Sequence, residues 1–167
     1  MFAVKEVFAT PAVSAIIERT MGGTTYILLQ RRQKQTGDET HGLIEIVGGK
    51  IREYENIFDA LRREVWEETG LRLTSIRGEN EQREIHVNGT RAISFQPFCT
   101  VQNLSGIYSL IMHIFICSAE GEPLPSTDET SDVHWERVET VKEMLEASPQ
   151  MFFPMDIIPL KKYTEQL

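Results

Sequence analysis

The segment 56–69 carries the strongest secondary-structure signal in the chain, because its periodicity and both of its ends agree. Ile57, Leu61 and Val65 recur four residues apart, which places them on one face of a helix. Asn56 can cap the first turn, and Gly70 can stop the helix after the last. The sequence therefore predicts an amphipathic helix over residues 56–69 that packs on the rest of the fold by one face.

Short β-prone runs surround this helix. The segment 20–23 and the Asn88-Gly89 pair are turn signals between such runs, and each predicts a hairpin. We expect strands at 12–17, 25–29, 43–47, 71–76, 83–87, 92–101, 108–118 and 133–138, and further helices at 140–147 and 155–166. Gly48-Gly49 is expected to break the strand at 43–47. This order favours the α+β class, with helices packed on a mixed β-sheet, and 167 residues fit a single domain over 1–167.

The charge balance argues against binding to a nucleic-acid polymer. Lys and Arg number 17 and Asp and Glu number 25, which gives a net charge of −8. A chain this acidic lacks the basic footprint that such polymers need. Net charge does not exclude a small polyphosphate, because a bound cation can invert the local field.

Cysteine usage and hydropathy indicate a cytoplasmic protein that does not bind a membrane. Cys99 and Cys117 form no metal-binding pattern and are expected to be buried or half-buried thiols in a reducing compartment. The longest apolar run, residues 107–117, is far shorter than a membrane span. No cleavable leader pattern is expected at the start of the chain.

The second half of the predicted helix carries an acidic face that suggests metal binding. Glu64, Glu67 and Glu68 are spaced i, i+3 and i+4, so they share one side of the helix, where like charges repel. They also lie near its C-terminal end, where the helix dipole disfavours anions. A divalent cation would remove this conflict, and carboxylate oxygens suit Mg²⁺ or Mn²⁺. A solvated acidic surface is the alternative explanation.

The residues around this face decide between the two explanations. Over residues 49–71 the chain reads Gly-x5-Glu-x7-Arg-Glu-U-x-Glu-Glu-x-Gly-U, where U is aliphatic. This pattern resembles the signature of the Nudix hydrolases at every fixed position. The resemblance implies an α/β/α sandwich that hydrolyses the pyrophosphate bond of a nucleoside diphosphate linked to another moiety, with Mg²⁺ or Mn²⁺ as cofactor and a small-molecule nucleotide as partner. A homodimer is also compatible with it.

The resemblance also implies roles for individual residues. Glu64, Glu67, Glu68 and the carbonyl of Gly49 match the metal ligands, and Arg63 matches the arginine that orients the glutamates. Glu55 matches a supporting glutamate, with a helix-start anion as its alternative role. The general base stays open between the glutamates of this motif and an acid of a distant loop. The candidates are Glu67, Glu68, Asp128, Glu129 and Asp132, and Glu129 is preferred among the loop acids.

Four further residues are candidates for substrate binding. Arg31 and Arg32 end the second predicted strand, where a phosphate could be received; exposed edge charges are the alternative. Glu45 interrupts the apolar strand that leads into the motif, and Lys50 follows Gly49. The substrate stays open among nucleoside triphosphates, nucleotide sugars and dinucleotide polyphosphates.

Two other functions compete with hydrolysis. The first is a catalytically inactive module that binds or senses a nucleotide; the intact glutamates argue against it. The second is a protein-interaction domain whose partner surface is the stretch 151–160, near the C-terminus. Apolar residues at 152 and 153 favour ordinary core packing for that stretch.

Overall fold

The fold is known from a computed structural model, which describes residues 6–33 and 38–167. The expectation about the chain start therefore lies partly outside the described residues. The strands are β1 Thr10–Met21, β2 Thr24–Arg32, β3 Ile44–Glu45, β4 Val47–Lys50, β5 Arg72–Ile76, β6 Arg83–Val87, β7 Thr90–Ser94, β8 Cys99–Gln102, β9 Leu110–Glu120 and β10 Thr130–Arg137. The helices are α1 Ile57–Thr69, α2 Val138–Ala147 and α3 Pro154–Thr164, with short 3₁₀ turns at Glu79–Glu81 and Pro149–Met151.

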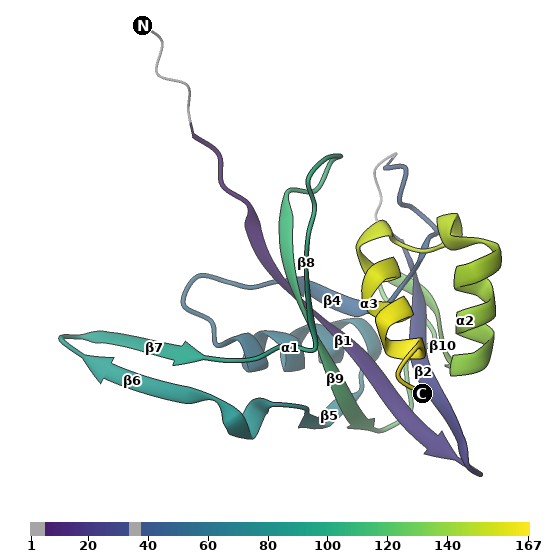
Figure 1. The fold of residues 1–167 in the computed structure, drawn as a ribbon, viewed down its shortest axis with the longest axis horizontal. Helices are drawn as coiled ribbons and strands as arrows, with labels where there is room; N and C mark the ends of the chain where they lie inside the picture. The colour runs from purple at the N-terminus through teal and green to yellow at the C-terminus, as the bar shows by residue number, and fades with distance from the viewer. Residues whose placement is uncertain (1–5, 34–37) are drawn as a thin grey trace, which may run out of the picture.

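The main sheet is mixed, as the sequence predicted. Its strand order is β10-β2-β1-β9-β5, and β3, β4 and β8 pair with β2, β1 and β9 respectively. The long strand β1 runs parallel to β9, while its other pairings are antiparallel. Because β1 pairs with β2 toward one end and with β4 and β9 toward the other, it joins the two parts of the sheet (Figure 1).

Helices cover both faces of this sheet, which confirms the predicted sandwich. Successive side chains of a strand point to opposite faces, and β1 shows this directly. Ile16 packs in a cluster with residues of α2 and α3, whereas Ile17 packs in a second cluster with residues of α1. Figure 1 shows α2 and α3 together at one end of the sheet and α1 behind it.

Local signals set the ends of α1. The Asn56 side chain accepts a hydrogen bond from the Phe58 N–H at 2.9 Å, and Gly70 ends the helix with a φ of 71°. The buried face of α1 includes Ile57, Leu61 and Val65. The predicted helix and both of its end signals are confirmed.

Three predictions about strands were wrong. The run 43–47 is divided into β3 and β4 at Ile46, whose N–H donates to the Asp156 carboxylate and not to a neighbouring strand. Gly48-Gly49 does not break a strand but lies inside β4, paired with Val13 and Ser14 of β1. A Cβ on Gly48 would lie 2.4 Å from the Val13 carbonyl oxygen, so glycine is required by close approach rather than by a turn. The run 92–101 is divided into β7 and β8, because the intervening segment contains Pro97, which cannot donate to a ladder.

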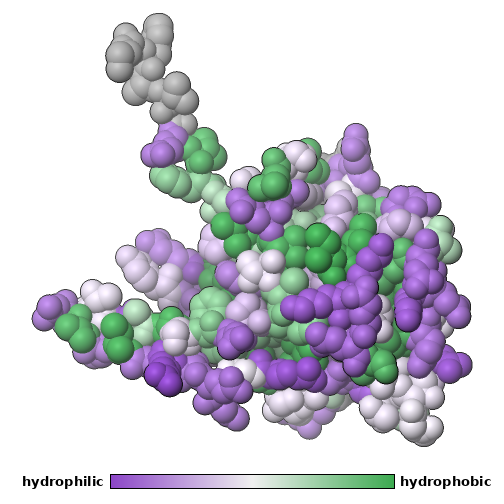
Figure 2. Space-filling view, in the orientation of Figure 1, coloured by the Kyte–Doolittle hydropathy of each residue, from purple (hydrophilic) through white to green (hydrophobic). Residues whose placement is uncertain are grey.

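Four further observations bear on the sequence predictions. Most of the stretch 151–160 is buried against the sheet, which contradicts the idea of a partner surface there. Cys117 is buried and Cys99 is half-buried, as predicted. The hairpin β6–β7 forms a separate two-stranded sheet that extends from the body with mostly exposed side chains (Figures 1 and 2). No described helix is both long enough and apolar enough to cross a membrane.

Candidate functional site

A cavity of about 400 Å³ lies where the acidic face of α1 meets the edge of the sheet and the start of α3. Its lining is rich in charge. The acidic lining residues are Glu45, Glu64, Glu67, Glu68, Glu129 and Asp156, and the basic ones are Arg32, Lys50, Arg52 and Arg63. Ser14, Tyr108, Met112 and Phe153 contribute neutral side chains. The glutamates of α1 are therefore the wall of a cavity and not a merely solvated face.

Arg63 holds the acidic side chains at the α1 end of the cavity. Its Nε and Nη2 donate to the two oxygens of Glu55 at 2.7 and 2.8 Å, and its Nη1 donates to Glu64 Oε1 at 2.5 Å and Glu67 Oε2 at 3.2 Å. Nη2 also donates to the Lys50 carbonyl at 3.1 Å. The hydrogen bonds from Arg63 lower the pKa of Glu55 to about 2, and those to Glu55 raise the pKa of Arg63. A single guanidinium thus fixes three carboxylates.

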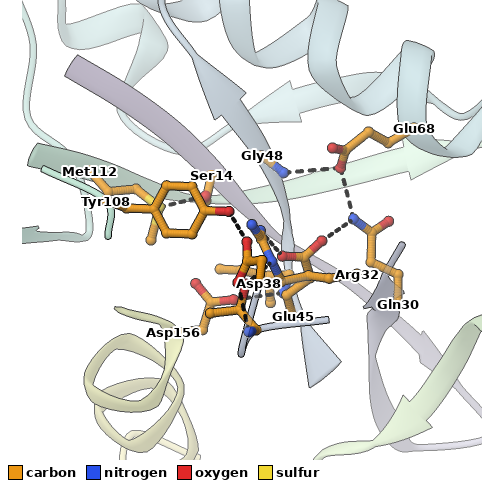
Figure 3. Close-up of polar contacts among 12 residues, drawn as sticks. Ser14, Gln30, Arg32, Asp38, Glu45, Gly48, Glu68, Tyr108, Met112 and Asp156 are labelled. Carbon is orange, nitrogen blue, oxygen red and sulfur yellow. Dashed lines mark hydrogen bonds and ion pairs between the residues drawn. The ribbon is translucent and has the colours of Figure 1, made fainter. Parts of the chain in front are cut away.

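Glu68 lies deeper than the other two glutamates of this face. Its Oε2 accepts hydrogen bonds from Gln30 Nε2 at 2.7 Å and from the Gly48 N–H at 3.3 Å (Figure 3). Burial raises its pKa to about 8, with a further contribution from the charges of Glu45 and Glu64. Burial also raises the pKa of Glu64. Negative charge is therefore costly here unless a cation is added.

The donors at this end fit a hard divalent cation by their chemistry. Glu64, Glu67 and Glu68 offer carboxylate oxygens, and Gly49 lies so close that a Cβ on it would be 2.3 Å from the Glu64 carboxyl carbon. Oxygen donors of this kind suit Mg²⁺ or Mn²⁺. Among the described residues no three acidic, His or Cys side chains surround one point, because Glu64 and Glu67 bind Arg63 while Glu68 binds Gln30.

The other end of the cavity combines one cation with aromatic rings. Arg32 Nη1 donates to Glu45 Oε2 at 2.6 Å, and the Arg32 guanidinium lies 4.4 Å from the centre of the Phe153 ring and 5.3 Å from that of Tyr108. Asp156, at the start of α3, accepts a hydrogen bond from the Ile46 N–H at 3.0 Å. Burial and the charge of Glu45 raise the pKa of Asp156 well above its usual range.

Most of the predicted site residues line this cavity. They are Arg32, Glu45, Gly49, Lys50, Arg63, Glu64, Glu67, Glu68 and Glu129. Arg31 does not line it, because its side chain binds Asp132 at 3.2 Å and the Gly42 carbonyl at 2.9 Å. Asp128 and Glu129 line a smaller adjoining pocket of about 200 Å³ together with the glutamates of α1. The chemical roles assigned to all these residues stay predictions.

Sequence analysis missed several residues of the cavity. Ser14 lies within the β-prone run 12–17, and Gln30 directly follows the run 25–29; neither carries a local signal of its own. Asp156 did carry one, because it is an isolated acid in the otherwise apolar run 151–160. Phe153 was predicted to be core, and it is buried, but it also lines the cavity.

Comparison with known proteins gives an independent test of the family. The family model described as "NUDIX domain" matches residues 9–154. No curated protein matches.

Solved structures share the fold at low sequence identity. The NUDIX domain of Shewanella oneidensis NrtR, complexed with ADP ribose, is 17% identical with a TM-score of 0.65, over 96% of this chain and 89% of that one. A hydrolase of the NUDIX family from Clostridium perfringens is 18% identical with a TM-score of 0.63, over 96% and 99%. A MutT protein from Methanosarcina mazei is 18% identical with a TM-score of 0.61, over 98% and 97%.

The sequence motif at 49–71, the sandwich that presents it at a cavity and the match over residues 9–154 agree. The chain therefore belongs to the Nudix hydrolase family, and this membership supports a pyrophosphohydrolase.

Proposed function

We propose that this chain hydrolyses a pyrophosphate bond in a nucleoside diphosphate linked to another moiety, and that it uses Mg²⁺ or Mn²⁺. One observation carries the proposal: a single cavity joins the three glutamates of α1 to an end with Arg32 and two aromatic rings. The acidic end suits a cation and the phosphates that the cation binds. The other end offers a guanidinium and ring faces, which suit a polar, planar group such as a nucleobase.

The roles of the residues follow from their positions. Glu64, Glu67, Glu68 and the Gly49 carbonyl would hold the cation, which, when bound, neutralises phosphate charge and lowers the pKa of a water molecule. Arg63 keeps Glu64 and Glu67 in place through its own pair with Glu55. Lys50 and Arg52 line the same end and can bind phosphate oxygens. Glu129 can take the proton of the attacking water, since it lines both the cavity and the adjoining pocket together with the glutamates of α1.

The substrate class is the least constrained part of the proposal. Nucleoside triphosphates, nucleotide sugars and dinucleotide polyphosphates all carry the required bond. The NrtR domain was solved with ADP ribose, and a C. elegans Ap4A hydrolase shares this fold with a TM-score of 0.55 at 12% identity. Both ligand classes therefore belong in the test. A cytoplasmic location stays a prediction from the sequence, and a homodimer stays a state compatible with the family resemblance.

The decisive experiment is a substrate panel with controlled metal. Nucleoside triphosphates, ADP-ribose, nucleotide sugars and dinucleotide polyphosphates are each incubated with Mg²⁺, Mn²⁺ or EDTA, and phosphate products are separated and quantified. The proposal predicts turnover of at least one class with Mg²⁺ or Mn²⁺ and none with EDTA. Nucleotide binding without turnover of any class would instead support the inactive binding module.

A further inference from the structure

Gln30 lies between two acidic side chains of the cavity, although neither the sequence motif nor the proposed roles include it. Its side chain is fully buried in β2. Its Nε2 donates to Glu68 Oε2 at 2.7 Å and to Glu45 Oε1 at 3.3 Å (Figure 3). Both hydrogens of one amide nitrogen are thus engaged by carboxylates from different elements, α1 and β3.

This contact determines how Glu68 presents its two oxygens. Oε2 accepts hydrogen bonds from Gln30 Nε2 and from the Gly48 N–H, so two donors already occupy it. Oε1 accepts no hydrogen bond from any residue in the described ranges, and Glu68 lines the cavity. The oxygen held by the protein and the oxygen available to a ligand are therefore different atoms of the same carboxylate.

An amide suits this position better than a basic side chain would. Glu45 and Glu68 are both buried and of like charge, and a double donor between them offsets their repulsion. A lysine or arginine would do the same but would also neutralise Glu68 and compete with a bound cation. Gln30 supplies donors without positive charge. The positive charge that balances Glu45 comes from Arg32, which donates to the other carboxylate oxygen, Oε2.

The amide also carries a cost that packing alone does not explain. Gln30 Oε1 is buried and has no hydrogen-bond partner in the described part of the chain. A buried unpaired carbonyl lowers the stability of the folded chain. An apolar side chain of similar size would avoid this cost, so the amide hydrogens are the reason for glutamine at this position.

We propose that Gln30 is a positioning residue for the cation site: it holds Oε2 of Glu68 so that Oε1 is available to the divalent cation. The same amide links this end of the cavity to the Glu45–Arg32 pair at the other end. This inference rests on the proposed metal-dependent hydrolysis and adds to it a residue outside the motif at 49–71.

The test measures metal binding directly, without turnover. Gln30→Met keeps a similar volume but has no donor, and Gln30→Asn keeps an amide that is one methylene too short to reach both carboxylates. Mn²⁺ affinity is measured by electron paramagnetic resonance on the whole chain without substrate. We expect the Mn²⁺ dissociation constant of Gln30→Met to rise by about 10–100-fold, as for residues that orient metal ligands, with a smaller rise for Gln30→Asn.

Leu28→Val is the matched control, because Leu28 lies on the same strand, packs in the cluster on the α1 side and has no polar side-chain atom that could join this hydrogen-bond network. It should lower the Tm and leave Mn²⁺ affinity unchanged. The inference is overturned if the Gln30 variants lose Tm but bind Mn²⁺ like the wild type, or if Leu28→Val weakens Mn²⁺ binding equally. If the wild type itself neither binds Mn²⁺ nor turns over any substrate of the panel, the proposed function fails and the inference fails with it.

Discussion

The guanidinium of Arg63 and the carboxylate of Glu55 form a two-point ion pair, with Nε–Oε1 at 2.7 Å and Nη2–Oε2 at 2.8 Å. Both side chains are about 15% exposed, so the pair is largely shielded from solvent. This pair fixes the plane of the guanidinium and directs the remaining nitrogen, Nη1, to Glu64 and Glu67. Glu55 therefore acts on the candidate cation site through Arg63, although it does not line the cavity itself.

Glu55→Gln should lower stability at neutral pH by about 1–2 kcal/mol, because it removes the charge and one of the two hydrogen bonds to Arg63. Folding lowers the pKa of Glu55 from 4.5 to about 2. The unfolded chain therefore binds this proton more readily, and the stabilising contribution is complete above about pH 4.5 and is lost as the pH falls toward 2. Urea unfolding of the wild type and of Glu55→Gln should show that the difference between their free energies of unfolding shrinks as the pH falls through this range. A difference that stays constant would contradict the assignment of this stability to the Glu55–Arg63 ion pair.

The paired glycines of β4 should respond differently to alanine. At Gly49 the three atoms nearest to an added Cβ all belong to the carboxyl end of Glu64, at 2.3–2.5 Å, and that flexible end can turn away. At Gly48 the Cβ would lie 2.1 Å from Ser14 Oγ and 2.4 Å from the Val13 carbonyl, so the backbone of the sheet must move. We expect Gly49→Ala to keep its Tm and lose hydrolysis, and Gly48→Ala to lose about 1–3 kcal/mol of stability. Thermal unfolding and turnover measured on both variants separate the two effects, and a large loss of Tm in Gly49→Ala would contradict this account.

The buried pair of Arg32 and Glu45 allows stability and substrate binding to be separated. Arg32→Met removes the cation that faces Glu45 and should cost about 3–5 kcal/mol. The double variant Arg32→Met/Glu45→Met should regain most of this stability, because well-packed apolar residues can replace a buried pair. If this pair also binds substrate, the KM of the double variant stays above the wild-type value although its stability is restored. A KM that returns to the wild-type value together with the Tm would assign the pair to folding alone.

Features set by residues close together in the sequence could be predicted, whereas features set by residues far apart could not. Asn56, Gly70 and the spacing of Glu64, Glu67 and Glu68 act within α1, so local pattern was sufficient for the helix and its acidic face. Gln30 and Asp156 gain their roles from partners 38 and 110 residues away, and nothing beside them in the sequence indicates those partners. Only the assembled sheet brings them to the cavity.

Glycine illustrates the same limit in another way. Gly70 and Gly48 look alike in sequence, yet Gly70 adopts a left-handed conformation at a helix end and Gly48 lies within a strand against β1. The neighbouring arginines Arg31 and Arg32 give a second example. They are chemically identical, but side chains alternate along β2, so only Arg32 lines the cavity. The difference is set by which face of the sheet is covered, which local sequence does not specify.

The most direct test of the central claim compares turnover in Glu64→Gln, Glu67→Gln and Glu139→Gln at saturating Mg²⁺, using the best substrate of the panel. Glu139 is an exposed glutamate on α2 outside the cavity and serves as the control. The account predicts a loss of about 100-fold or more in kcat for the two α1 variants, with unchanged Tm, and wild-type turnover for the control. Turnover that survives both α1 substitutions, or that persists in EDTA, would contradict metal-dependent hydrolysis at this face of α1.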